Sequence, residues 1–280
     1  MRKPLSTQGL PVPTHFLSAA QRRRYAAYDG SPSTEDLALH FHLDDADRDR
    51  VAKRRGRHNC LGFAVQLGTV LFLGRFTSDF DEVPDSIIKY LARQIGVRDP
   101  AACLRLYHSA DTRQRHQREI QEVYGYRRFS EPSVRVALAR WLDGRAWMTG
   151  ARPSVLFDDA TRWLVHRRVL LPGSSALERL VARTRRATQE RLWRLLAAEC
   201  SADQVVALDR LLETSDGFGR TTLDRLRQAP RKIDKQEIVG ALERLEEVRS
   251  LGIGEIDLSS VPPRQLRLLA LHGAAAKAHS

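Results

Sequence analysis

The sequence is poor in cysteine, in long apolar runs and in nucleotide-binding motifs, and each shortage excludes a class of protein. Its three cysteines, Cys60, Cys103 and Cys200, are widely spaced and form no C-x-x-C pair, which excludes a disulfide scaffold and argues against structural zinc. The odd count suits a reducing cytosol. No run of about eighteen apolar residues occurs, so the chain predicts no membrane-spanning helix. The phosphate-loop spacing G-x-x-x-x-G-K-S/T is absent, and we expect no metal or other cofactor.

The charge is strongly one-sided. Lys and Arg number 46 against 34 Asp and Glu, which gives a formal net charge of +12 and a pI near 10.2. Only six of the 46 are Lys, so forty are Arg, whose planar guanidinium fits phosphates and guanine edges. This balance favours nucleic acid or an anionic surface as the partner. We expect double-stranded DNA rather than RNA, because no RNP-type aromatic strand pattern occurs.

Apolar residues at helical spacing recur along the chain and predict an all-α protein. A length of 280 residues with 42% hydrophobic content allows two domains with cores of their own. We predict two helical domains, residues 1–130 and 131–280, with a soft boundary where S-E-P-S (Ser130–Ser133) starts a new helix. The apolar stretch Ile253–Ile256 is the one segment short enough to suggest a strand.

A helix pair in the first domain resembles a helix-turn-helix. Ser33 or Thr34 is expected to cap a short helix, and Asp44 a second one that is acidic at its start and basic at its end. That charge order complements the helix dipole, which is a sufficient explanation in terms of stability. Alternatively, the second helix enters a major groove of DNA.

The segment Arg54–Leu67 joins a basic run directly to an apolar stripe. We predict that Asn59 caps a helix running to about Leu73, because apolar residues then recur at helical spacing. The functional interpretation is a DNA-contacting edge held on a core helix. The alternative is a solvated basic turn, which is common for charge runs.

Further arginine clusters follow along predicted helices. They occur on a first helix, on the helix Ser109–Tyr124 with its G-Y-R-R-F continuation, on a long helix to Glu199, and at two turns near residues 220 and 231. Most would contact phosphates and few would read bases. The candidate DNA-binding residues are Arg22, Arg23, Arg24, Lys53, Arg54, Arg55, Arg57, His58, Asn59, Arg113, Arg115, Arg118, Arg127, Arg128, Arg183, Arg185, Arg186, Arg220, Arg231 and Lys232.

Acidic residues are scattered among predicted caps and helix surfaces. Asp79, Asp81 and Glu82 fall in the segment Gly74–Pro84, which we interpret as a solvated loop rather than a metal site. A nuclease or recombinase would need clustered acids and a divalent ion. We therefore assign no catalytic residue.

Five motifs in order resemble one protein family. They are R-R-G-R-H-N-C-L-G-F-A-V-Q-L (Arg54–Leu67), P-x-x-I-I-K-Y-L-A-R-Q-I-G (Pro84–Gly96), H-Q-R-E-I-Q-E-V-Y-G-Y-R-R-F (His116–Phe129), L-L-P-G-S-S-A-L-E-R-L (Leu170–Leu180) and L-S-S-V-P-P-R-Q-L (Leu258–Leu266). Together they resemble the N-terminal part of a Tn-three-type transposase, which moves replicative class II transposons. The resemblance covers nearly the whole chain.

The resemblance implies two helical domains that bind the transposon's terminal inverted repeats. It also implies that the family's acidic catalytic domain lies further along than this chain extends, so we expect no strand transfer by this polypeptide and classify it as a non-enzyme. Alternatives are an autonomous transposition repressor and a helical scaffold for transposase self-association, with other transposase subunits as partners. We expect a cytoplasmic, nucleoid-associated bacterial protein without membrane contact.

Overall fold

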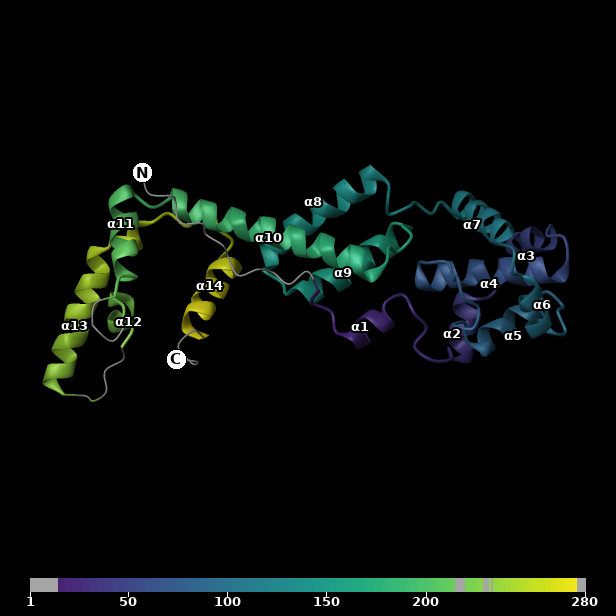
Figure 1. Cartoon of the computed structure of the whole chain (residues 1–280), viewed down its shortest axis with the longest axis horizontal. Coiled ribbons are helices and arrows are strands. Elements are labelled where there is room, and N and C mark those ends of the chain that lie inside the picture. The colour runs from purple at the N-terminus through teal and green to yellow at the C-terminus, as the bar shows by residue number, and fades with distance from the viewer. Residues whose placement is uncertain (1–14, 215–219, 229–231, 233, 276–280) are drawn as a thin grey trace. The chain divides into compact units, whose positions relative to one another are not determined.

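The protein is all-α (Figure 1). The computed structural model describes residues 15–214, 220–228, 232 and 234–275, with side chains up to residue 270. Two isolated β-bridges are the only strand-like pairings in this described part. The helices are α1 (Ala19–Arg24), α2 (Thr34–His40), α3 (Asp45–Ala52), α4 (Arg57–Leu73), α5 (Asp85–Gln94), α6 (Pro100–Leu106), α7 (Ala110–Tyr124), α8 (Pro132–Thr149), α9 (Pro153–His166), α10 (Ser174–Ala198), α11 (Ala202–Leu211), α12 (Thr222–Leu226), α13 (Lys235–Ser250), the 3₁₀ helix η1 (Ile253–Glu255) and α14 (Pro263–Ala275).

The chain divides into two compact units. The larger comprises Pro11–Ala146 and Ala151–Arg185, and the smaller contains Trp147–Gly150 and the chain from Arg186 onward. The predicted division at residue 130 falls inside the larger unit, and the two DNA-binding domains remain a prediction. No helix among the described residues is both long and apolar enough to cross a bilayer.

Helix α4 is the central element of the larger unit. It packs against α2, α3, α5, α6 and α7, and ten consecutive residues, Leu61–Val70, are buried. A helix that is apolar on all sides can satisfy this pattern only inside a core. The predicted end at Leu73 is confirmed, because Gly74 adopts a left-handed conformation with φ +72°.

The predicted start of α4 is wrong. The helix begins at Arg57, after Gly56 with φ +86°, and not at an Asn59 cap. The side chain of Asn59 instead donates from Nδ2 to the Arg55 carbonyl at 2.7 Å. Glycine tolerates a positive φ that other residues avoid, so the chain reverses three residues earlier than the cap pattern indicated.

The larger unit buries two hydrophobic clusters among its described residues. The first surrounds α4 and includes Phe41, Phe63 and Ile120. The second gathers α8, α9 and the first half of α10, together with Leu17 near the N-terminus. Backbone hydrogen bonds at 125–171 join them. Arg127 N–H donates to the Arg168 carbonyl at 2.8 Å, and Leu170 N–H to the Arg127 carbonyl at 2.9 Å.

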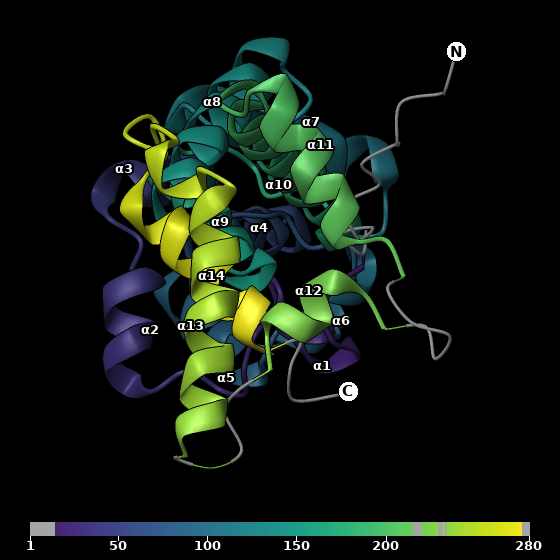
Figure 2. The same cartoon turned by 90° about the vertical axis from the view of Figure 1, so that its left-hand side faces the viewer.

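The smaller unit is a set of short capped helices, and Figure 2 shows α13 beside α12. Ser201, Thr221 and Asp234 cap α11, α12 and α13, and each side chain accepts a backbone N–H. The predicted strand at Ile253–Ile256 is wrong. Gly252, with φ +63°, starts a tight turn there, and residues 253–255 form a 3₁₀ helix.

Two glycines in the larger unit predict opposite effects of the same substitution. A Cβ on Gly62 in α4 would lie 2.4 Å from the Tyr107 ring, whereas a Cβ on Gly144 in α8 would meet nothing within 4 Å. We expect Gly62→Ala to destabilise the fold by about 1–3 kcal/mol through overpacking. Gly144→Ala should stabilise it by up to about 1 kcal/mol through helix propensity. Urea denaturation would check both, and equal midpoints would contradict the packing.

Candidate nucleic-acid interface

Arg54, a leading DNA-contact candidate, has its guanidinium occupied within the protein. Its Nη1 and Nη2 lie 2.6 Å and 2.9 Å from the two carboxylate oxygens of Glu119 on α7. The guanidinium also lies 5.0 Å from the centroid of the Phe63 ring, and only 15% of the side chain is exposed. A bidentate pair with an aromatic neighbour fixes geometry. Arg54 therefore holds α7 against the turn before α4.

The Arg54–Glu119 ion pair, called the clamp below, brings together two basic segments that are 65 residues apart in sequence. Lys53 and Arg55 flank Arg54 in the turn, and Arg115 and Arg118 precede Glu119 on α7. All four side chains are exposed, and none forms an ion pair among the described residues. We call these four residues the basic edge. Unpaired, exposed cations fixed on a rigid support are suited to binding a polyanion.

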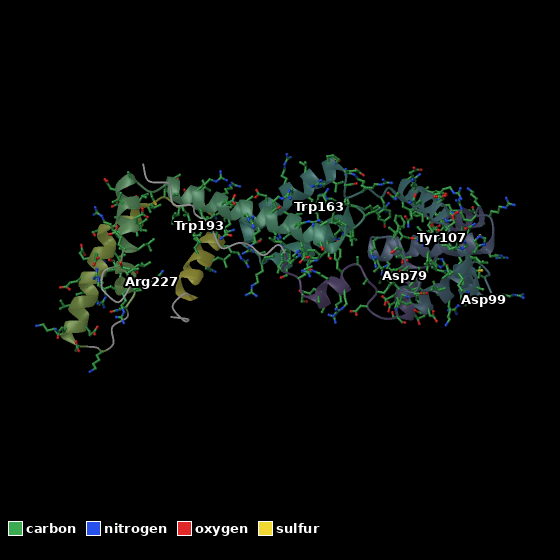
Figure 3. The ribbon with its side chains drawn as sticks, viewed as in Figure 1. Asp79, Asp99, Tyr107, Trp163, Trp193 and Arg227 are labelled. Carbon is green, nitrogen blue, oxygen red and sulfur yellow. The ribbon has the colours of Figure 1, made fainter. Side chains whose placement is uncertain are left out.

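His116, between Arg115 and Arg118 on α7, adds no charge to the basic edge. It is buried and its Nδ1 lies 2.9 Å from the hydroxyl of Tyr107, which lies inside this helical cluster (Figure 3). Burial, together with the charges of Arg54 and Arg115, lowers the pKa of His116 to about 4, because these effects outweigh the opposite effect of Glu119. The ring is therefore neutral at physiological pH.

The other predicted DNA contacts at the start of α4 are Arg57, His58 and Asn59, and they differ in exposure and in their contacts. Arg57 is exposed, but its Nη1 donates to the Ile95 carbonyl at 2.8 Å, just after α5. Asn59 is engaged with Arg55 as described, and His58 is half-buried beside Gly56. These three residues start α4 rather than standing clear of it.

Helix α3, the second helix of the helix-turn-helix-like pair, is poorly suited to entering a major groove of DNA. Asp45 and Asp49 are exposed on it, and the capping Asp44 is exposed as well. Carboxylates at these positions would face DNA phosphates of like charge. Helix α7 exposes Gln114, Arg115 and Arg118 instead.

Among the described residues, only Arg22 of the three consecutive arginines on α1 is bound to a carboxylate inside the protein. Arg22 donates from Nε and Nη2 to Glu178 of α10 at 3.1 Å and 3.2 Å, and Glu178 is fully buried. Arg23 and Arg24 are exposed, with no ion pair in the part of the chain that the structure describes. Sequence reasoning missed both Glu119 and Glu178. The sequence did contain a signal for Glu178, because it is one of only two acidic residues in the basic run from Arg162 to Arg194.

The remaining candidates in the larger unit are engaged to different degrees. Arg113 donates to the Ser78 carbonyl at 3.3 Å, and Arg128 to Gln121 at 3.2 Å. Arg127 contacts Glu131 at 3.1 Å and Ser133 at 2.8 Å. These residues lie on the surface, but each already has a partner.

The α10 candidates differ in exposure. Arg183 and Arg186 are exposed, and Arg179, four residues before Arg183, shares its face of the helix. Arg185 is half-buried, donates to the Ala151 carbonyl, and has a pKa lowered by burial. Further along, Arg220 and Lys232 are exposed, and Arg231 lies outside the described residues.

The structure assembles no metal-ligand group from its described side chains. No three His, Cys, Asp or Glu residues gather there as metal ligands would. Asp79, at the predicted solvated loop, has a carboxylate that accepts the Asp81 backbone N–H at 2.9 Å (Figure 3).

Comparison with known proteins shows which family this chain is similar to. Residues 16–184 match a family described as a domain of unknown function, DUF4158. The chain is 36% identical over 259 residues to the transposase for transposon gamma-delta of Escherichia coli (strain K12), covering 92% of this chain and 26% of that protein. It is 29% identical over 258 residues to the transposase for transposon Tn501 of Pseudomonas aeruginosa, with the same two coverages.

A third relative agrees. The chain is 32% identical over 241 residues to the transposase for transposon Tn21 of Escherichia coli, covering 85% of this chain and 24% of that protein. The chain thus spans about a quarter of the length of the curated relatives it matches. Because the family match covers more than half of its residues, this chain belongs to the DUF4158 family, and its resemblance to part of a Tn-three-type transposase is confirmed.

Proposed function

We propose that this chain binds duplex DNA at the terminal inverted repeats of a transposon, as part of a transposase, and carries no strand-transfer chemistry of its own. The observation that supports this most directly is the basic edge, Lys53, Arg55, Arg115 and Arg118, held together by the Arg54–Glu119 clamp. The transposase relatives supply the biological context.

The basic edge would set the register of the complex. Its four cations would replace counterions on the DNA backbone, which gives affinity without sequence preference. Helix α7 would supply a base contact from Gln114, which is exposed four residues before the phosphate-binding Arg118. Glutamine is a side chain that reads the adenine edge in the major groove.

The first test is the affinity of the purified chain for its own terminal repeat against a scrambled duplex, titrated over salt. We expect a preference of about a thousandfold or more, with affinity falling steeply as salt rises. Equal, salt-sensitive binding to both duplexes would reduce the basic edge to a general phosphate contact. Binding to neither would contradict the proposal.

Two alternatives share this experiment. A repressor that occupies the repeats would bind as the proposal expects and also compete with an intact transposase for the same ends. A self-association scaffold is favoured by α13, where Ile238, Leu242 and Leu245 are 49%, 59% and 44% exposed at spacings of four and three. Salt-insensitive self-association without DNA binding would select the scaffold.

A further inference from the structure

A cleft of about 850 Å³ lies in the larger unit, away from the four residues of the basic edge. Three segments line it: the end of α1 with the following turn, the residues after α4, and the chain that leads into α10. Its lining contains arginine and aromatic side chains together. The residues that carry the argument are Arg22, Arg23, Tyr25, Tyr28, Arg75 and Phe76.

The three arginines of the cleft differ in availability. Arg22 is held by Glu178, and Arg75 donates to the Ala26 carbonyl and lies 3.1 Å from Glu82. Arg23 is exposed and has no ion pair among the residues described. The cleft therefore carries one uncompensated cation at its surface.

The start of α10 adds to the positive potential. Ser174 lines the cleft and is the first residue of this 25-residue helix. A helix N-terminus carries a partial positive charge and unsatisfied backbone N–H groups, which favour an anion.

The aromatic residues line the cleft with partly exposed rings: Tyr28 stacks on Phe72 with ring centroids 5.8 Å apart, and Tyr25 packs edge-on against Phe157 at 5.1 Å. The Tyr28 hydroxyl donates to Thr69 at 2.9 Å, whereas the buried Tyr25 hydroxyl has no hydrogen-bond partner in the described part of the chain. A buried hydroxyl without a hydrogen-bond partner destabilises the fold. Ala26, between these tyrosines, adopts a left-handed conformation with φ +51°, which is strained for a residue with a Cβ.

We propose that this cleft binds one unpaired nucleotide, with its phosphate at Arg23 and its base against the tyrosine and phenylalanine rings. Aromatic stacking with a basic neighbour is how proteins hold unpaired bases. Bases stacked inside a duplex present no free face to an aromatic ring, so the nucleotide must be free or displaced from a duplex. Its origin in transposon DNA rests on the proposed function; the affinity of the cleft for a nucleotide does not.

The test uses the full chain and fluorescence anisotropy with a labelled single-stranded hexanucleotide. Arg23→Gln should weaken binding about tenfold, the loss of one charged hydrogen-bonding group. Arg24→Gln is the matched control, because this substitution removes the same charge from α1 and Arg24 does not line the cleft. It should change the affinity less than twofold. Equal losses in the two variants would overturn the proposal.

Tyr25→Phe separates a ligand contact from a packing role. Without a ligand role, removal of an unpaired hydroxyl would raise thermal stability and leave hexanucleotide binding unchanged, which would overturn the role of Tyr25. The proposal expects weaker binding in a variant at least as stable as the wild type. Tyr28→Phe, which breaks a hydrogen bond to Thr69, serves as the control for loss of a hydroxyl with an internal partner.

Competition identifies the source of the nucleotide and isolates this site from the basic edge. Deoxyadenosine monophosphate competing as well as the hexanucleotide would support the cleft and assign it to free nucleotides. Competition by a terminal-repeat duplex with unpaired end nucleotides, but not by its blunt form, would assign it to DNA. Blunt-duplex binding does not require the cleft, so a wild-type chain that binds the blunt duplex but no unpaired nucleotide contradicts the cleft and leaves the proposed function standing. No binding of the hexanucleotide, the monophosphate or the frayed duplex would overturn the proposal.

Discussion

Glu178→Ala is expected to destabilise the larger unit by about 3 kcal/mol. The carboxylate is fully buried, accepts the backbone N–H groups of Phe16 and Leu17 at 3.1 Å and 3.0 Å, and pairs with Arg22. Its removal leaves these donors unpaired, and breaking a buried pair from one side costs about 3–5 kcal/mol. The lower figure applies because 35% of the Arg22 side chain is exposed to solvent.

Urea denaturation followed by tryptophan fluorescence would measure this loss. Glu131→Ala is the matched control, because Glu131 pairs with Arg127 at 3.1 Å on the surface, with 39% of its side chain exposed. Exposed pairs contribute about 0–1 kcal/mol. Similar losses in both variants would contradict the role given to Glu178.

The same residue predicts a pH dependence of stability. Burial alone would raise the pKa of Glu178, but hydrogen bonds from Arg22 and from the Leu17 and Phe16 N–H groups outweigh it and lower the pKa. The folded protein therefore gains stability from Glu178 above the unfolded pKa, about 4.5, and loses it as pH falls through the lowered folded value. Glu178→Gln should show a smaller loss of unfolding free energy between pH 7 and pH 3 than the wild type.

Replacing the four residues of the basic edge by glutamine is expected to have the largest effect on DNA affinity. Each phosphate contact removed should reduce the slope of log affinity against log salt by about 1, so the quadruple variant should lose about 4. The fold should survive, because all four side chains are exposed and lie outside the internal ion pairs.

A second quadruple variant provides the control for total charge. Arg98, Arg105, Arg135 and Arg140 are also exposed in the larger unit. Glutamine at these positions removes the same four charges from other parts of the surface. Salt titration of duplex binding distinguishes the two variants, and equal slopes would mean that net charge, not the basic edge, drives binding.

Local signals in the sequence were enough for most of the fold. Ser33 and Asp44 cap α2 and α3 as predicted, because a side-chain oxygen at the N-cap acts within three residues. The start of α4 was missed because Gly56 and Asn59 both carry a boundary signal. The positive φ of the glycine determined the start, and nothing in the local spacing ranked one above the other.

The candidate site was only partly predictable, because charge type is local and charge pairing is not. Arg54 and Arg55 are indistinguishable by sequence, yet one is clamped to Glu119 and the other is exposed. The partner lies 65 residues away and is brought near only by the packing of α7 on α4. Sequence reasoning therefore found the basic segments but not which arginines hold the structure together.

The Glu178 contacts also affect the order of events during synthesis. Phe16 and Glu178 are separated by 162 positions, so the ribosome makes the anchor long after it makes the segment it holds. At roughly 5–20 residues per second, the delay is about 8–30 s. When Glu178 is made, every helix around α4 has already been synthesised, whereas α1 and the apolar Leu17 have until then lacked their binding site. The nascent chain thus completes its first cluster while its own beginning is still undocked.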